Sequence, residues 1–327
     1  MRLLLTGATG FVGRNFLLRA LSQYDAVFTP VRSEEKLRAQ LVAEGLDPRP
    51  GNLHVLPPEP LDWPDCRPDH ALLGAGVLFA RSRDEYFSTN VDWTLRGLRT
   101  LPDACRVTVL SSLSAGGPTP ARQDSRSETD SDTPITWYGE SKLALERILR
   151  SDFSRRNITV LRPPMILGAR DTATLPLFRM AGHFLRIKPG LQTKTYSFLA
   201  VEDLVDGILE VFQQAAALPP ESYYVSAARP VTDGEILAGA AACRKVRGLT
   251  VPIPQPAVRL LSALVDVVPS LRKQVPSLTR DRAREIWPSR WVADGARLSG
   301  LTGWRPRRDL EETLRSTHNY FLREGLL

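Results

Sequence analysis

"LLLTGATGFVG", residues 3–13, is an apolar run that leads directly into a glycine-rich turn. Its glycines stand at positions 7, 10 and 13, with the spacing G-x-x-G-x-x-G. In such a turn the first glycine permits a tight bend, the second lets the backbone approach a pyrophosphate, and the third allows the next helix to pack on the strand. Backbone N–H groups at the start of that helix would point at the anion. The stretch therefore predicts a strand, a phosphate-binding turn and a helix. We expect the turn to bind a dinucleotide through Gly7, Thr9, Gly10, Phe11, Val12 and Gly13.

The rest of the N-terminal half alternates short apolar runs with helical periodicity. Strands are expected at Arg2–Thr6, Ala26–Val31, Val77–Ala80, Arg106–Ser111 and Thr159–Arg162, with an edge strand near Leu53–Leu56. Helices are expected at Val12–Ser22, Ser33–Glu44, Phe87–Leu101 and Ser141–Arg155. Strands that alternate with helices form right-handed crossovers. The pattern predicts an α/β fold, a Rossmann-type, doubly wound parallel sheet.

The pattern becomes irregular and proline-rich after about residue 165. We therefore expect a dinucleotide-binding domain at 1–165, to which the chain returns around 195–228, and a smaller, mostly helical substrate-binding region at 166–327. Helices are expected near 203–215 and 233–247, with a terminal helix from Asp309. The apolar piece "PAVRLLSALVDVVPSL" (256–271) has helical spacing and is interpreted as a core or lid helix. Contact with a membrane surface or a lipid-like substrate is the alternative interpretation.

Composition excludes several classes of function. Of the 327 residues 43% are hydrophobic and 24% charged, which is typical of a globular protein. The basic residues behind the net charge of +7 are scattered without interleaved aromatics, so nucleic-acid binding is not expected. No apolar run approaches the roughly 18–20 residues that span a bilayer, and the first residues meet glycines too soon for a secretory signal, so stable membrane association is not expected. Three cysteines without a shared motif favour reduced thiols and a cytoplasmic protein, and the four histidines lack metal-ligand spacing.

The end of the second predicted strand bears on the choice of cofactor. An acidic residue there would hold the ribose 2′-OH of NAD, whereas an arginine suits the 2′-phosphate of NADP. The sequence reads "FTPVRSEEK", with Arg32 at this point and Glu34 and Glu35 slightly later. NADP(H) is the preferred prediction and NAD(H) the alternative, with Arg14 as a second candidate contact.

A tyrosine and a lysine stand four residues apart in "WYGESKLALE", residues 137–146. On a helix this spacing places Tyr138 and Lys142 on one face. A neighbouring cation lowers the pKa of a phenol, which could then exchange a proton with a substrate oxygen. The strand in "VTVLSSLSAGG" (107–117) ends in Ser111 and Ser112, and ligands of such sheets bind beyond the carboxyl ends of strands. Ser112 is therefore expected to donate a hydrogen bond to the substrate oxygen.

As a set, these motifs resemble the extended short-chain dehydrogenase/reductases, the NAD-dependent epimerase/dehydratase group. The resemblance rests on "TGATGFVG", the Asn90 of "STNVDWT", "SSLSAGGP", "YGESK", "LRPPMILG" and "FLAVEDL", and it extends to the tail from "WVADGARLSG" onward. It implies that Tyr138 transfers the proton, that Lys142 lowers the pKa of that phenol and binds the nicotinamide ribose, and that Ser112 orients the substrate. It further implies that Asn90 holds a relay water or the helix that positions the lysine, that Pro163 and Ile166 flank the nicotinamide, and that the protein is a homodimer.

The chain departs from the family pattern in ways that bear on its substrate. Nucleotide-sugar enzymes of the family carry Arg-Asp-aromatic before the V-x-D segment, where this chain has "KTYSFLAVED" with Tyr196 and Ser197. A dehydratase would have an acid beside Ser112, where Leu113 and Ser114 stand. "HVLPPEPLDW" offers no clean adenine-contacting Asp, and "LFARSRDEYF" replaces the alanine-rich turn after the fourth strand.

These departures favour an oxidoreductase that acts on the carbonyl or secondary alcohol of a small molecule. The prediction places the chain on the hydroxysteroid-dehydrogenase and dihydroflavonol-reductase side of the family. A nucleotide-sugar epimerase or dehydratase that uses the same groups is the alternative. A non-catalytic dinucleotide-sensing protein is a further one.

Overall fold

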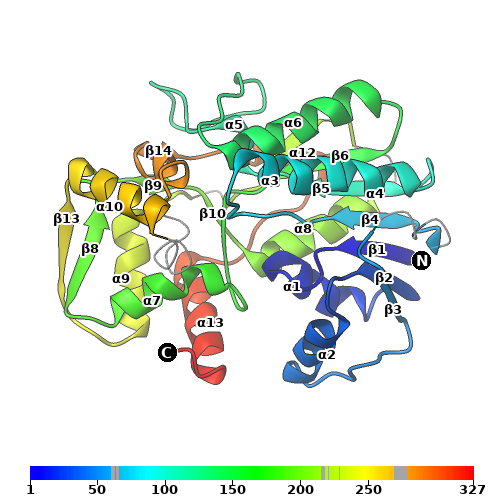
Figure 1. Cartoon of the computed structure of the whole chain (residues 1–327), viewed down its shortest axis with the longest axis horizontal. Coiled ribbons are helices and arrows are strands. Elements are labelled where there is room, and N and C mark those ends of the chain that lie inside the picture. Colours follow the sequence, from blue (N-terminus) through cyan, green and yellow to red (C-terminus); the bar gives the residue numbers. More distant parts are fainter. Residues whose placement is uncertain (60–62, 64–65, 215–217, 220, 228, 269–278) are drawn as a thin grey trace.

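A computed structural model describes residues 1–59, 63, 66–214, 218–219, 221–227, 229–268 and 279–327. Its centre is a seven-stranded sheet in the order β11-β6-β5-β4-β1-β2-β3, in which every pairing is parallel (Figure 1). The strands are β1 (Arg2–Thr6), β2 (Ala26–Pro30), β3 (Leu53–Leu56), β4 (His70–Leu73), β5 (Arg106–Leu110), β6 (Ile158–Arg162) and β11 (Ser222–Tyr224). The order reverses between β1 and β4, which opens a crevice at the carboxyl ends of these strands.

Helices cover both faces of the sheet, because successive residues of a buried strand point to opposite sides. On one face Leu3 and Leu5 of β1 share a core with α1 (Phe11–Ala20), α2 (Glu34–Ala43) and α8 (Val201–Gln213). On the other face Leu4 shares a core with side chains of α4 (Thr94–Thr100) and α6 (Trp137–Asp152). The predicted doubly wound, Rossmann-type sheet is confirmed.

The chain after β6 adds smaller elements at one end of the sheet (Figure 1). Three small sheets pair β7 (Met165–Leu167) with β10 (Phe198–Ala200), β8 (Leu185–Pro189) with β13 (Leu249–Ile253), and β9 (Thr195–Tyr196) with β12 (Val231–Thr232) and β14 (Arg290–Trp291). The helices here are α7 (Leu175–Ala181), α9 (Asp233–Cys243), α10 (Gln255–Val267) and α13 (Leu310–Arg323), whereas α12 (Ala296–Thr302) packs beside β11 of the main sheet. A separate apolar core of side chains from α7, α9 and α13 supports this end. The division of the chain into domains near residue 165 stays a prediction. β11 lies within residues 195–228, where the chain is expected to return to the first domain, and it pairs with β6 of the main sheet.

Most element predictions agree with the structure, but the strand expected at Val77–Ala80 is wrong. The strand in this position is β4, and the chain leaves the sheet at Gly74. The backbone of residues 74–76 packs on the glycine-rich turn so closely that a Cβ on Gly7 would lie 3.0 Å from the Ala75 nitrogen. "HALL" and "GVLFA" are equally apolar, so composition could not choose between them.

Two predicted helices begin four residues earlier than expected. The helix expected at Phe87–Leu101 begins earlier, as α3 (Arg83–Phe87), and continues through a π-helix, Ser88–Trp93, into α4. The helix expected at Ser141–Arg155 begins at Trp137, because the Thr136 hydroxyl caps it by accepting from the Gly139 N–H at 3.2 Å. Residues 60–62 and 64–65, in and after "HVLPPEPLDW", and residues 269–271 of the predicted core or lid helix lie outside the described residues.

Within the described part of the chain, no helix combines the length and the apolarity needed to cross a membrane.

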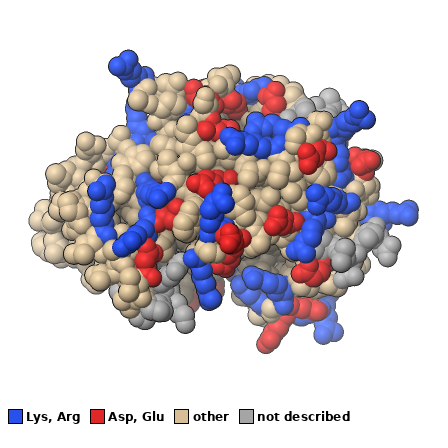
Figure 2. Space-filling view, turned by 45° about the horizontal axis from the view of Figure 1, so that its top comes forward, with Lys and Arg blue, Asp and Glu red and all other residues tan. Residues whose placement is uncertain are grey.

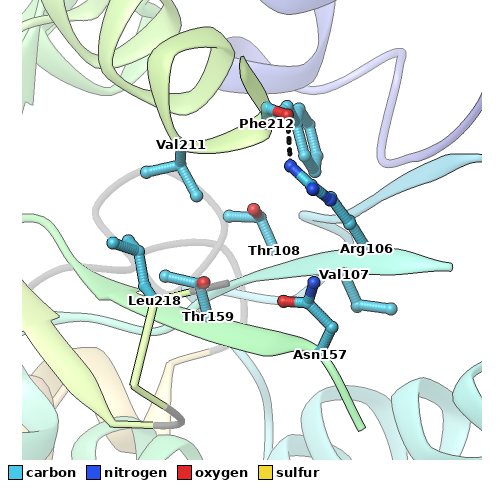
Figure 3. Close-up of a pocket in the computed structure, with 8 residues that line it drawn as sticks. All are labelled: Arg106, Val107, Thr108, Asn157, Thr159, Val211, Phe212 and Leu218. Carbon is cyan, nitrogen blue, oxygen red and sulfur yellow. Dashed lines mark hydrogen bonds between the residues drawn. The ribbon is translucent and has the colours of Figure 1, made fainter. Parts of the chain in front are cut away.

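A small pocket of about 10 Å³ lies between β5, β6 and the end of α8, near the amino ends of the strands (Figure 3). It contains the Thr108 hydroxyl, which has no hydrogen-bond partner among the described residues, and it has room for about one water molecule. The pocket is too small to be a substrate site.

Candidate functional site

A cavity of about 510 Å³ lies at the carboxyl ends of the central strands. Ten of the predicted site residues line it: Gly7, Gly10, Phe11, Val12, Gly13, Ser112, Tyr138, Lys142, Pro163 and Ile166. They come from the turn after β1, the loop after β5, the first turns of α6 and the segment after β6. The fold therefore brings together groups that lie up to about half the chain apart in sequence.

The turn after β1 has the shape that a bound pyrophosphate requires. Gly7 adopts a positive φ of 80°, and the Gly10 N–H donates to the Gly7 carbonyl at 2.9 Å. A Cβ on Gly13 would lie 2.1 Å from the Gly7 oxygen, so only glycine lets α1 start this close to the strand. Among the described residues no side chain caps the N-terminus of α1, whose first residues line the cavity, so its first N–H groups are available to bind an anion. These residues fit the diphosphate of a dinucleotide.

The Lys142 ammonium is buried at the base of the cavity. Its Nζ donates to the carbonyl of Leu110, the last residue of β5, at 2.8 Å, and it lies 6.0 Å from the centre of the Tyr138 ring. Burial lowers the pKa of Lys142 to about 8, against a smaller opposing effect of the Glu146 carboxylate. Lys142 thus links the helix of Tyr138 to the strand that precedes Ser112.

Burial raises the pKa of the Tyr138 phenol, while the Arg282 guanidinium and the nearby Ser112 side chain lower it. Arg282 is the cation with the largest effect on this phenol, so an effect of Lys142 on its pKa stays a prediction. Ser112 and Tyr138 approach one another because α6 packs tightly on α5 (Leu113–Gly116), the short helix whose N-cap is Ser112. A Cβ on Gly139 would lie 2.3 Å from the Ser114 carbonyl oxygen.

Asn90 lies behind the cavity and does not line it. This fully buried residue belongs to the π-helix, a local form that often occurs at functional sites. Its Oδ1 accepts from the Val77 N–H at 2.8 Å, and its Nδ2 donates to the Val77 carbonyl at 3.3 Å and to Ser141 Oγ at 3.0 Å. The amide thereby joins the loop after β4 to α6, which supports the helix-holding alternative for its predicted role.

A buried ion cluster, not predicted from the sequence, supports the inner side of α6. The Glu146 carboxylate accepts from Arg162 Nη2 at 2.6 Å and from Ser222 Oγ at 2.7 Å, and Ser111 donates to it as well. Arg162 also donates to Asp132 at 2.7 Å. Burial opposes the charge of Arg162, but Glu146 and Asp132 raise its pKa above the ordinary value. The cluster joins α6, β6, β11 and the polar loop before α6.

Residues from the second half of the chain complete the lining of the cavity. Arg282 and Glu285, from the 3-10 helix Arg282–Ile286, line it together with Tyr196 and Trp291. Arg282 pairs with Glu285 through contacts of 3.0 and 2.9 Å, and its Cζ lies 5.2 Å from the centre of the Tyr138 ring. Glu285 in turn accepts from the Thr136 hydroxyl at 2.9 Å.

Sequence reasoning missed this pair, and its only local signal is the basic stretch "TRDRAREIW" (279–287). Asp171 was missed as well. It lines the cavity, and burial raises its pKa to about 6.

Three residues with a predicted or suggested cofactor role lie elsewhere. Arg32 follows β2 and is exposed, and it does not line the cavity; neither does Thr9. Arg14 is turned toward Glu44, with which it forms a 2.5 Å ion pair. In the described part of the chain, no group of three or more His, Cys, Asp or Glu side chains is arranged to hold a metal ion.

The fold and the cavity define a dinucleotide-binding α/β protein, and comparison with known proteins assigns the family. The sequence profile of the NAD dependent epimerase/dehydratase family matches residues 3–226. The chain belongs to this family, the extended short-chain dehydrogenase/reductases. The resemblance inferred from the motifs is thereby confirmed, and the family indicates a nicotinamide dinucleotide as the cofactor.

Individual relatives resemble the chain over most of its length. A ceramide reductase of Caulobacter vibrioides is 27% identical over 307 residues, which cover 90% of this chain and 87% of the relative. The UDP-glucose 4-epimerase of Thermotoga maritima, solved with UDP-glucose, matches with a TM-score of 0.77 and 19% identity, covering 100% of both chains. RMD from Pseudomonas aeruginosa, solved with NADPH, matches with a TM-score of 0.71 and 19% identity, covering 100% of this chain and 99% of RMD.

Proposed function

We propose that this protein is an NAD(P)-dependent oxidoreductase that reduces a ketone, or oxidises a secondary alcohol, of hydrophobic character. The observation that carries the proposal is the position of the Tyr138 phenol in the cavity beside Ser112, with Lys142 buried one helical turn away. A nicotinamide bound in the cavity supplies or accepts the hydride. The glycine-rich turn, Lys142, Pro163 and Ile166 would hold that cofactor, because all of them line the same cavity.

Each residue of the set has a separate chemical task. In the reducing direction Tyr138 gives its phenolic proton to the carbonyl oxygen as that oxygen gains charge, and in the oxidising direction its phenolate takes the hydroxyl proton. Ser112 donates a hydrogen bond to the same oxygen and orients it. Lys142, whose Nζ lies 6.0 Å from the centre of the Tyr138 ring, stabilises the negative charge on the phenolate. Arg282, which also lines the cavity, adds a second cation 5.2 Å from the centre of the same ring.

The cavity wall supports a hydrophobic substrate over a nucleotide sugar. Leu78, Leu113, Met165 and Trp291 contribute apolar side chains to it. Ser197 stands where sugar-nucleotide enzymes carry Asp. Its hydroxyl is hydrogen-bonded to the backbone of Ala293: it accepts from the Ala293 N–H at 3.0 Å and donates to the Ala293 carbonyl at 3.3 Å. The relative that is named a ceramide reductase supports reduction of a lipid-like carbonyl compound.

A nucleotide-sugar epimerase is the second candidate, because solved structures with the same fold include a UDP-glucose 4-epimerase. The purified protein distinguishes the two reactions. With hydrophobic ketones and NADPH or NADH we expect net oxidation of the cofactor, measured as a loss of the absorbance of the reduced nicotinamide. Interconversion of UDP-sugar epimers without net cofactor change would instead establish the epimerase.

The catalytic assignment is tested by Tyr138→Phe, with Tyr223→Phe as the matched control. Tyr223 is a buried phenol that donates to the Pro219 carbonyl at 2.9 Å and does not line the cavity. We expect Tyr138→Phe to lower kcat by at least about 100-fold, the usual scale of general acid–base catalysis, while the control stays near wild type. Unchanged turnover in Tyr138→Phe would show that the phenol is not the proton donor.

A further inference from the structure

Exposed apolar side chains gather on one end of the molecule. Of sixteen large hydrophobic side chains that are well exposed among the described residues, ten lie in the two segments 184–191 and 249–267. These segments hold β8, β13 and α10, which lie together at the left of Figure 1. Scattered exposed apolar residues are normal on a protein surface, whereas a concentration of this kind marks an interaction site.

In the strand pair β8–β13 the apolar side chains face solvent and the charged ones face inward. Leu185 is paired with Leu249, and Ile187 with Val251, so these four side chains share one face, and their exposed fractions are 58%, 59%, 49% and 39%. The charged neighbours point the other way: Arg186 is 5% exposed and donates to the Val246 carbonyl at 2.6 Å. A sheet with one face in water ordinarily places its apolar side chains inward. Here the outward face is the apolar one.

Helix α10 carries a second set of exposed apolar side chains. It begins one residue after β13, and its inner side is formed by the buried residues Val258, Ser262 and Val265. Leu260 and Leu264, on its outer side, are exposed, as is Val267 one turn further on. The core-helix interpretation therefore describes only half of α10. We call the face made by Leu185, Ile187, Leu249, Val251, Leu260 and Leu264 the outer apolar face.

The exposed charges next to the outer apolar face are mostly basic. In segment 179–195 Arg186 and Lys194 are buried and Lys188 pairs with Asp233 at 2.9 Å, so the basic rim comes from segment 244–268, which contains four basic residues and one acidic residue, Asp266. Lys245 and Arg247, directly before β13, and Arg259 of α10 are all exposed. In Figure 2 uncharged surface predominates at this end of the molecule.

We propose that the outer apolar face docks reversibly on a membrane surface that carries anionic lipids. The apolar side chains would enter the boundary between headgroups and acyl chains, while the basic residues contact lipid phosphates. A second copy of the chain fits less well, because a twofold contact would bring two basic rims together. Such docking is weaker than stable anchoring, and it does not depend on the proposed reaction.

Vesicle co-sedimentation tests the proposal. We expect the full chain to bind vesicles of phosphatidylcholine mixed with phosphatidylglycerol, to bind vesicles of phosphatidylcholine alone at least about tenfold more weakly, and to lose binding as salt rises. The variant Leu260→Ser/Leu264→Ser should lose affinity for the anionic vesicles by a factor of about ten or more. The variant Val42→Ser/Leu322→Ser is the matched control, because these side chains are 57% and 49% exposed outside the face.

Other results would overturn the docking proposal: no binding of the wild type to either vesicle, equal binding to both, or equal losses in the two double variants. A wild-type dimer that Leu260→Ser/Leu264→Ser converts to a monomer, measured by light scattering, would assign the face to self-association instead. Turnover of a water-soluble ketone should be the same in both double variants and the wild type. The docking and the reaction can therefore fail separately.

Discussion

The buried environment of Lys142 disfavours the charged form of its side chain. The ammonium is buried and donates to one carbonyl, that of Leu110, and its pKa falls to about 8 because water is excluded. In the unfolded chain the pKa returns to about 10.5. Between these two values the unfolded state binds more protons than the folded state, so stability rises with pH in this window.

Replacing this lysine should therefore remove a pH-dependent contribution to stability. We expect the free energy of unfolding of the wild type, minus that of Lys142→Met, to rise between pH 8 and pH 10.5. The whole rise should be of the order of 3 kcal/mol, at about 1.4 kcal/mol per pKa unit. Urea unfolding at several pH values measures it. A flat difference curve would mean that Lys142 titrates normally in the folded protein.

Arg282 is the charged residue with the largest effect on the pKa of the proposed proton donor, Tyr138. Its guanidinium carbon lies 5.2 Å from the Tyr138 ring centre, and Glu285 holds it through two contacts. A cation at this distance favours the phenolate and lowers the pKa of Tyr138. Arg282→Gln removes the charge and should raise this pKa.

In the alcohol-oxidising direction the phenolate is the active form, so the rising limb of kcat/KM against pH should move to higher pH in Arg282→Gln. Arg282→Lys should move it less, because the charge remains. The exposed Arg284→Gln, on the same 3-10 helix, serves as the control and should leave the limb in place. An Arg282→Gln limb that coincides with that of the wild type would exclude an electrostatic role for Arg282.

At the scale of elements, α6 is held at its start and along its inner side. The Thr136 hydroxyl caps it, and Asp281 accepts from the Trp137 N–H at 3.2 Å, so the C-terminal third of the chain is tied to the first turn. Further along, Glu146 joins the buried cluster with Arg162. Tyr138 and Lys142 lie between these two attachments. The position of both residues therefore depends on contacts at each end.

Breaking the buried cluster should cost much more than breaking a surface pair on the same helix. Glu146→Gln removes a carboxylate from fully buried partners and should lower the free energy of unfolding by about 3 kcal/mol. Glu140→Gln breaks a partly exposed pair with Arg83 and should cost less than about 1 kcal/mol. Urea titration of both variants measures the two losses. Equal losses would mean that the cluster adds nothing beyond a surface contact.

At the scale of the whole molecule, both regions of the chain line one cavity. The glycine-rich turn lies on one side, and Tyr196, Arg282 and Trp291 lie on another. A ligand that fills the cavity contacts both regions and stabilises the folded state as a unit. The exposed Arg32 stands outside the cavity lining, at the end of β2, where we propose that it contacts the 2′-phosphate of NADP.

NADP⁺ at a hundredfold excess over its Kd should stabilise the protein by about 2.7 kcal/mol and shift a single thermal transition upward. We expect a smaller shift with NAD⁺ at the same concentration. Arg32→Ala should remove the difference between the two cofactors, whereas the exposed Arg155→Ala, after the C-terminal end of α6, should preserve it. Differential scanning calorimetry measures the shifts. A larger shift with NAD⁺ in the wild type would contradict the proposed NADP preference.

Local patterns predicted the elements well where composition and spacing pointed the same way. β1 and β3 have the predicted bounds, because each is a short, mostly apolar run that turn residues follow directly. β4 was misplaced because "HALL" and "GVLFA" look alike, and only pairing with β1 and β5 distinguishes them. The start of α6 was placed four residues late, because its cap depends on Thr136, outside the apolar periodicity.

The amino-acid sequence by itself determined the glycine-rich turn, the alternation of strands and helices, and the helical spacing of Tyr138 and Lys142. Each depends on residue types within a few positions of one another, so short-range geometry is enough. Only the tertiary structure decided that Arg282 and Glu285 stand beside Tyr138, that Glu146 meets Arg162, and that the apolar side chains of β8, β13 and α10 face outward. These contacts join segments whose separation in the sequence carries no periodic signal, and they exist only because the folded backbone brings the segments together.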